Sequence, residues 1–337
     1  MSGPVEEIQL IPAPSDSISC VRFSPDTSDL LLVSSWDNTL SLYDVPSNRL
    51  RLKAEVGNPL LSCTFGPDRT RAFSGGLHGA VAQYDLEQNS TNPNVLGSHE
   101  KGVAHVRYSQ STNQVFSGSW DGNVSGWDPK ANTKAPTMQL KQSGKVYAMS
   151  FHEHLLVVGT STKQIALYDI RRGGDPIREM ESPLKYQIRC IKLFPDGQGF
   201  VIGSTEGRVA LEYVDPDRKG YSFRCHREKI SETETYVFPI NAVAFHRQFG
   251  TFATGGCDGI INVWDGENKK RINQFVKDQA TKYPTSIASM DFNHDGTRLA
   301  IASSYTFEEG EKDHPEDAIF VRTIHEADVR PKKKAAA

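Results

Sequence analysis

ISCVRFSPDTSDLLLVSSWDNTLSLYDV, residues Ile18–Val45, is the first of seven related segments in this chain. Each segment reads as a short alternating strand, a polar turn such as SPDTSD, a second strand, a tight D-N or D-G turn and a third strand. No long window has helical periodicity. The six later segments begin at Leu60, Val103, Lys145, Ile188, Ile240 and Ile287. Self-similarity at a fixed period of about forty residues indicates a repeat architecture.

The repeats predict a closed ring of small sheets. One sheet of three or four strands cannot bury both of its faces, whereas radial stacking gives each sheet two neighbours and leaves only short, protected edges. The seventh unit ends differently, in the strand-like AIFVRTI from Ala318, and lacks one strand, which the leading segment Glu6–Pro12 has the composition to supply. We therefore predict an all-β fold, a single seven-bladed β-propeller over residues 1–330 that the N-terminal strand closes, with a short basic tail at 331–337.

Composition and charge narrow the class of protein. The chain has 337 residues, a net charge of −3 and five cysteines without a C-x-x-C pair, which indicates free thiols in a reducing compartment. It has no evident signal peptide and no run as long as a membrane span. We expect a cytosolic or nuclear protein that binds neither membrane nor nucleic acid. The lysines at 332–334 read as a solvated chain end, although they could assist nuclear import.

Motifs for catalysis and cofactor binding are missing from the sequence. There is no G-x-x-x-x-G-K-[ST] phosphate loop, no H-E-x-x-H and no G-x-S-x-G. His152 and His154 are close in sequence, but they fall at a turn between strands and lack metal spacing. Catalytic carboxylate pairs stay open, but nothing singles one out. We expect no catalytic residues, no metal and no cofactor, hence not an enzyme.

Two tryptophans are candidate anchors for a partner. Trp36 in SSWDN and Trp120 in GSWDG precede the tight turn of their units, at a blade end where an indole offers a large apolar surface with one N–H donor. The alternative for both is core packing. Trp127 and Trp264 begin the W-D ending and are expected in the core.

The fifth unit is unusually basic, with Lys185, Arg189, Arg208, Arg224 and Arg227. Arginines on adjacent strands can converge on one anion, because a guanidinium fork gives a carboxylate or phosphate two parallel hydrogen bonds. The alternative is that they are solvated and paired with glutamates at 206 and 212. Two insertions break the period, one at Pro216–Pro239 with a strand and a charged loop, the other an acidic loop at Tyr305–Asp317. The sequence leaves open whether the acidic loop joins the binding surface.

Several strings resemble one family of WD40 propellers. SSWDNTLSLYDV, GSWDG, LKYQIRCIKLFP, EGRVALEY, FRCHR, FATGGCDG, YPTSIAS and HPEDAIFVR are similar to the spindle-assembly-checkpoint protein of the budding-uninhibited-by-benzimidazole family, over nearly the whole chain. The messenger-RNA export propeller of nuclear pores is the runner-up, because it shares KYQ-x-R-C, EGRVA and CHR. EYVDP, NKKRINQF, YPTSIAS and HPEDAIFVR favour the checkpoint family.

The resemblance implies a non-enzymatic scaffold of the mitotic checkpoint. Its implied partners are checkpoint kinase and kinase-like proteins, bound through a short GLEBS segment, and phosphorylated Met-Glu-Leu-Thr repeats of the kinetochore scaffold. Through the checkpoint complex it would also reach the anaphase-promoting complex. The implied location is the nucleus, kinetochores in mitosis and the cytoplasm.

Matched by position, Trp36, Trp120 and Arg189 would bind the partner segment, and Arg208 and Arg224 would bind phosphothreonine. Ile188 stands where the family more often has a small polar residue, which puts the side-chain placement of Arg189 in doubt. The export alternative implies a nucleoporin GLEBS segment as the partner instead.

Overall fold

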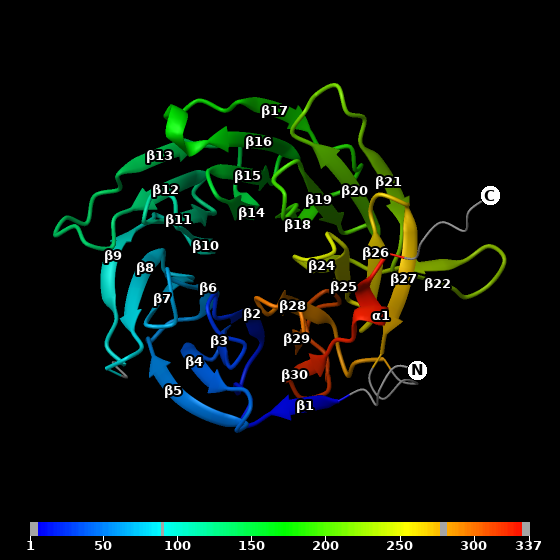
Figure 1. The fold of residues 1–337 in the computed structure, drawn as a ribbon, viewed down its shortest axis with the longest axis horizontal. Helices are drawn as coiled ribbons and strands as arrows, with labels where there is room; N and C mark the ends of the chain where they lie inside the picture. The colour runs from blue at the N-terminus through cyan, green and yellow to red at the C-terminus, as the bar shows by residue number, and fades with distance from the viewer. Residues whose placement is uncertain (1–5, 89–90, 277–281, 332–337) are drawn as a thin grey trace.

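Seven four-stranded antiparallel sheets stand around a central channel in the computed structural model, which describes residues 6–88, 91–276 and 282–331 (Figure 1). This confirms the predicted seven-bladed propeller. The basic tail from 332 lies outside the described residues. Blade 1 consists of β2 (Ile18–Phe23), β3 (Leu30–Ser35), β4 (Thr39–Asp44) and β5 (Arg49–Glu55). Blade 2 consists of β6 (Leu60–Phe65), β7 (Arg71–Gly76), β8 (Ala80–Asp85) and β9 (Asn94–Ser98). Blade 3 consists of β10 (Val103–Ser109), β11 (Gln114–Ser119), β12 (Asn123–Trp127) and β13 (Met138–Lys141).

The remaining blades follow the same order from the channel outward. Blade 4 consists of β14 (Val146–His152), β15 (Leu155–Thr160), β16 (Gln164–Asp169) and β17 (Arg178–Glu181). Blade 5 consists of β18 (Ile188–Leu193), β19 (Gly199–Ser204), β20 (Arg208–Tyr213) and β21 (Tyr221–Arg224). Blade 6 consists of β24 (Ile240–Phe245), β25 (Phe252–Gly256), β26 (Ile261–Asp265) and β27 (Lys270–Phe275). A 3-10 turn at Ile170–Arg172 and the short α1 (Glu326–Val329) are the helical segments described.

Blade 7 joins both ends of the described chain. It is built from β28 (Ile287–Phe292), β29 (Arg298–Ser303), β30 (Ala318–Thr323) and, on its outer side, β1 (Glu7–Leu10). β1 pairs antiparallel with β30, so that Glu7 stands opposite Arg322. The predicted closure of the ring by the N-terminal strand is therefore confirmed.

The core lies between neighbouring blades rather than in one central mass. One apolar cluster, for example, combines Leu32 and Leu40 of blade 1 with Cys63 and Tyr84 of blade 2. Glycines on second strands permit this close approach: a Cβ at Gly75 would lie 2.4 Å from a methyl carbon of Val103 in the next blade. Gly255 is in the same position, since a Cβ there would lie 2.4 Å from a methyl carbon of Ile287 in the next blade.

Two buried polar networks tie tight turns to the strands beside them. His99 contacts Asp121 at 2.9 Å through Nδ1 and Ser117 Oγ at 2.7 Å through Nε2, and Trp127 donates its indole N–H to the same hydroxyl at 2.7 Å. His226 repeats this arrangement in blade 6 with an aspartate, a threonine and the indole of Trp264. These histidines, and the two W-D tryptophans, are therefore structural.

The insertion after blade 5 is more ordered than the sequence indicated. Beyond β21 the chain forms a separate two-stranded hairpin, β22 (Arg227–Lys229) and β23 (Thr235–Val237), where a charged loop was predicted. The hairpin projects from the edge of the disc (Figure 1). Its strands are exposed along their length, so the alternating burial that usually marks a strand is missing.

Candidate partner-binding site

One end of the channel opens into a hollow of about 900 Å³, which we call the channel mouth. Residues from all seven blades line it, because every inner strand begins there. The inner-strand residues of this lining include Ser19, Leu61, Ala104, Tyr147, Arg189, Asn241 and Ala288.

These seven residues share a β-bulge. Near the start of every inner strand the pairing with the second strand skips one residue, between Ile188 and Cys190 in blade 5 for example. A bulge leaves the extra residue unpaired and re-aims its side chain. The bulge therefore directs Arg189 to the channel mouth, and the apolar Ile188 before it is buried.

Both candidate tryptophans lie at the channel mouth. Trp36 is 38% exposed, and its amide N–H donates to the carbonyl of Ser17 at 2.9 Å. Trp120 is half-buried and makes the matching bond to Gly102 at 2.9 Å. Its ring packs on that glycine, where a Cβ would lie 2.9 Å from the indole. Both tryptophans line the hollow, and Trp36 is the more exposed of the two.

Arg189 is held across the boundary between blades 5 and 6. Its Nε and Nη2 donate to Asn241 Oδ1 at 3.2 and 2.8 Å. The amide nitrogen of Asn241 donates in turn to Cys257 Sγ at 3.2 Å and lies 3.4 Å from Thr306 Oγ1. Within the described part of the chain Nη1 of Arg189 has no hydrogen-bond partner, so the exposed guanidinium can still donate to a ligand.

The acidic insertion also reaches the channel mouth, through two aromatic residues that the sequence could not place. Tyr305, Thr306 and Phe307 all line the hollow, and Phe307 is 67% exposed. Tyr305 is buried and donates its hydroxyl to the carbonyl of Gly310 at 2.9 Å, which fixes the loop. Their place in the repeat could have indicated this location, because the three residues come after the second strand of blade 7, as Trp36 comes after that of blade 1.

Arg208 and Arg224 stand directly opposite each other on neighbouring strands of blade 5. β20 pairs antiparallel with β21, and the register matches these two residues. Directly opposed residues point to the same face of a sheet, with Cβ atoms about 4.5–5.5 Å apart. The two side chains therefore leave the blade on one side.

Little in the structure neutralises this pair. Arg208 Nε lies 3.8 Å from Glu206 Oε2, and its Nη1 donates to Ser222 Oγ at 3.4 Å. Arg224 is exposed and has no ion pair or side-chain hydrogen bond to any residue that the structure describes. Of the pairings with glutamate that the alternative interpretation requires, the described residues show for these two arginines only that of Arg208 with Glu206. Two like charges opposite each other repel, and an anion between them would remove the repulsion.

The mouth residues and the arginine pair form two separate areas. Trp36, Trp120 and Arg189 line one hollow, whereas Arg208 and Arg224 do not line it. Thr205, which does, lies three residues before Arg208. The pair therefore lies near the mouth on blade 5 but outside its lining.

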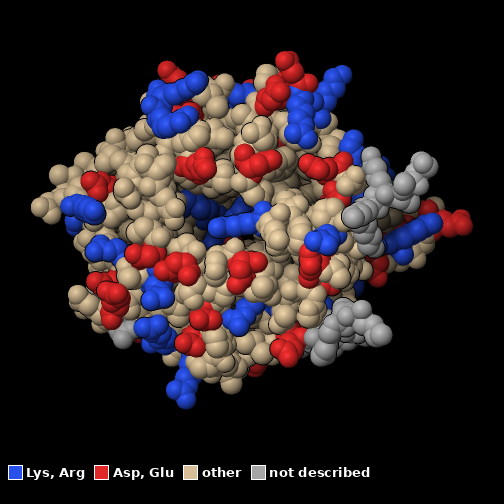
Figure 2. All heavy atoms as spheres, viewed as in Figure 1, with Lys and Arg blue, Asp and Glu red and all other residues tan. Residues whose placement is uncertain are grey.

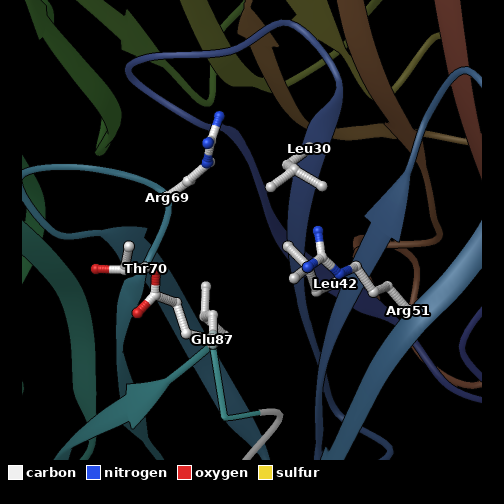
Figure 3. A pocket seen from close by; sticks show the side chains of 7 residues that line it. Leu30, Leu42, Arg51, Arg69, Thr70 and Glu87 are labelled. Carbon is white, nitrogen blue, oxygen red and sulfur yellow. The ribbon is translucent and has the colours of Figure 1, made fainter.

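Within residues 6–88, 91–276 and 282–331, no cluster of three His, Cys, Asp or Glu residues could hold a metal ion. In the same ranges no helix has the length and apolar character needed to span a membrane. A small pocket of about 190 Å³ lies between blades 1 and 2, near the turns opposite the mouth, where Arg51, Arg69, Thr70 and Glu87 surround Leu30 and Leu42 (Figure 3).

Comparison with known proteins gives consistent matches. The family model for the WD domain, G-beta repeat, matches residues 6–44, 91–128 and 221–265. Mitotic checkpoint protein BUB3.1 of Arabidopsis thaliana is 46% identical over 95% of this chain and 94% of its own length. Mitotic checkpoint protein bub3 of Dictyostelium discoideum is 43% identical over 92% of each chain. The mRNA export factor GLE2 of Chaetomium thermophilum is 34% identical over 90% of this chain and 85% of its own.

Proposed function

This chain belongs to the Bub3 family of mitotic checkpoint proteins, and from that membership we propose that it is a non-enzymatic scaffold at kinetochores. In this proposal the channel mouth binds the GLEBS segments of checkpoint kinases and kinase-like proteins. The arginine pair of blade 5 binds phosphothreonine in Met-Glu-Leu-Thr repeats of the kinetochore scaffold. The protein would be found in the nucleus and cytoplasm, and at kinetochores in mitosis.

The observation that carries the first half of the proposal is the composition of the channel mouth. Accessible indoles of Trp36 and Trp120, the guanidinium of Arg189 and the ring of Phe307 surround a hollow that is large enough for a peptide. Tryptophan and arginine dominate interface energetics, because they combine a large contact area with directed hydrogen bonds. Arg189 lies on an inner strand, and Trp36 and Trp120 directly follow second strands, so the sheets hold these side chains in place and little ordering is needed when a segment binds.

The second half rests on the geometry of Arg208 and Arg224. A phosphothreonine carries nearly two negative charges and three acceptor oxygens. Two forked guanidinium groups on one face of a sheet can each give it two hydrogen bonds, which lysines cannot do. Partial exposure of both side chains leaves them reachable from solvent.

Titration calorimetry with two synthetic peptides tests both halves. A GLEBS peptide is expected to bind the wild-type protein, and Trp120→Ala should weaken that binding without lowering the unfolding temperature to a matching extent. Equal losses of stability and binding would assign Trp120 to packing and contradict the proposal for the mouth.

A phosphorylated Met-Glu-Leu-Thr peptide tests the arginine pair. Arg208→Ala and Arg224→Ala should each cost roughly 2–5 kcal/mol of binding free energy, while the GLEBS peptide still binds. Arg51→Ala, which removes an exposed arginine from the outer strand of blade 1, is the matched control. Unchanged affinity in both variants, or equal binding of the unphosphorylated peptide, would refute this half.

A second candidate function is messenger-RNA export, supported by the 34% identity to the export factor of Chaetomium thermophilum. That function would put a nucleoporin segment in the channel mouth. Affinity capture from mitotic extract separates the two, because it recovers either checkpoint kinases or a nucleoporin. The higher identity to checkpoint proteins favours the first outcome.

A further inference from the structure

Below the mouth, the central channel narrows to a cavity of about 110 Å³. The pairing of inner with second strands places one residue of each blade at the same level around the channel, and we call these seven residues the channel ring. Arg22, Arg107 and Lys192 of the ring line the cavity. In blade order the ring consists of Arg22, Thr64, Arg107, Ser150, Lys192, Ala244 and Asp291. Blades 1, 3 and 5 thus each contribute a cation. Figure 2 shows lysine and arginine side chains in the central hollow of the disc.

Most hydrogen-bond donors of these three cations are uncommitted. Nη1 of Arg22 donates to the carbonyl of Val21 at 3.0 Å, and Nη1 of Arg107 donates to that of Val106 at 2.8 Å. No described residue accepts a hydrogen bond from Nε or Nη2 of either arginine, or from Nζ of Lys192. Each guanidinium has five N–H donors and the ammonium has three, so the cavity wall presents many donors to whatever fills it.

Negative charge at this level is limited. Asp291 is the one carboxylate of the channel ring among the described residues. Its Oδ1 lies 4.0 Å from Nη1 of Arg22, and its Oδ2 accepts the amide N–H of Phe23 at 3.0 Å. The three cations of the ring therefore exceed its one carboxylate.

The cations affect one another through the channel. Burial, followed by the charge of Arg22, lowers the pKa of Lys192 to about 7. Burial, again followed by Arg22, lowers the pKa of Arg107 to about 10. His105, next to them, donates to the carbonyl of Tyr147 at 2.9 Å, and burial lowers its pKa to about 3, so it stays neutral. Partly desolvated like charges are costly unless a counter-charge joins them.

We propose that the channel ring binds a small oxyanion of the phosphate class between Arg22, Arg107 and Lys192. Forked guanidinium groups from blades 1 and 3 and an ammonium from blade 5 match the several acceptor oxygens of such an ion. The cavity volume admits an ion of a few heavy atoms with its waters and excludes a nucleotide. The ion would join three non-adjacent blades at the axis, in a site that neither Arg208 nor Arg224 lines.

Calorimetry and thermal unfolding of the full chain with inorganic phosphate test this site. Ionic strength is held constant with sodium chloride, and sulfate serves as an oxyanion that does not titrate. We expect saturable binding of one ion and an unfolding temperature that rises with its concentration. Absence of saturable binding by both oxyanions would overturn the proposal.

Variants then locate the ion. Arg107→Met and Lys192→Met should each weaken phosphate binding about tenfold or more, and Asp291→Asn should strengthen it by removing a competing negative charge. Arg69→Met, an exposed arginine of the pocket in Figure 3, should bind as the wild type does. If Arg107→Met does not fold, Lys192→Gln takes its place. Binding that is unchanged in the lysine variants and in Asp291→Asn would place the ion elsewhere and overturn the proposal.

Discussion

Single residues of blade 5 combine a stability cost with a candidate binding role. Arg208 and Arg224 oppose each other across two strands, and only Arg208 has a carboxylate within 4.0 Å among the described residues. Like charges at directly opposed positions destabilise a sheet by a few tenths of a kcal/mol up to about 1 kcal/mol. Residues that lower the stability of the free protein are typical of ligand-binding sites.

Arg224→Ala is therefore expected to raise the free energy of unfolding of the free protein by roughly 0.2–1 kcal/mol. The reason is that the repulsion with Arg208 disappears while no ion pair to a described residue is lost. Urea denaturation at low salt measures the gain, and high salt should reduce it by screening. A destabilised variant would mean that Arg224 has a packing role that outweighs the repulsion.

Lys192 makes the second prediction about a single residue. Burial and Arg22 lower its pKa to about 7 in the folded protein, against about 10.4 in an unfolded chain. Between these values the unfolded state binds more protons, so the stability of the wild type rises with pH relative to Lys192→Met, by up to about 1.3 kcal/mol per pH unit. Urea denaturation in phosphate-free buffer from pH 7 to 10 checks this. A constant difference between the two proteins would contradict it.

Among the elements, β1 depends on one buried ion pair. Glu7 Oε2 lies 3.4 Å from Nη1 of Arg322 on β30 and accepts the hydroxyl of Tyr283 at 2.7 Å. The side chains of Glu7 and Arg322 are only 12% and 7% exposed. β1 is four residues long, and this ion pair acts together with the buried side chain of Leu10 and the pairing with β30.

Glu7→Ala is expected to lower the free energy of unfolding by about 3–5 kcal/mol, because it leaves the buried guanidinium of Arg322 without its carboxylate. Glu6→Ala changes the exposed neighbour and should have little effect. Chemical denaturation of both variants measures these changes in the free energy of unfolding. A loss below 1 kcal/mol for Glu7→Ala would show that the bond of Arg322 to the carbonyl of Val276 and its stacking on Phe275 suffice.

Element prediction from the sequence succeeded where the repeat recurs and failed where backbone irregularity matters. The repeating strands follow from the recurring apolar segments and turn residues, and the closing strand at Glu7–Leu10 follows from the composition of the leading segment and the strand that unit seven lacks. The bulges could not be predicted in this way, because one extra residue leaves the apolar pattern of an inner strand almost unchanged. The extra residue nevertheless redirects Arg189 and Asn241. The hairpin β22–β23 was missed because both of its strands are exposed.

At the level of the whole molecule, closure of the seven blades determines which candidate sites could be predicted from the sequence. The facing positions of Arg208 and Arg224 follow from neighbouring strands of one repeat, so sequence spacing predicts them. The channel mouth and the channel ring instead combine residues from blades far apart in the chain, such as Arg22, Arg107 and Lys192. Only closure into a circle brings these together, and no local pattern encodes it.

This difference between a local and an assembled site gives the last prediction. Deletion of residues 1–10 removes β1 and leaves β30 as an open edge, while all four strands of blade 5 remain. The channel mouth needs seven blades in register, so the GLEBS peptide should bind the truncated protein at least about tenfold more weakly, a cost of 1.4 kcal/mol or more. The phosphothreonine peptide, whose two arginines lie within one sheet, should lose far less. Parallel calorimetry with both peptides measures the two losses, and Glu7→Ala in mild urea replaces the deletion if the truncated chain does not fold. Equal weakening of both would mean that the arginine pair also depends on the closed ring, and that the two areas are not separate sites.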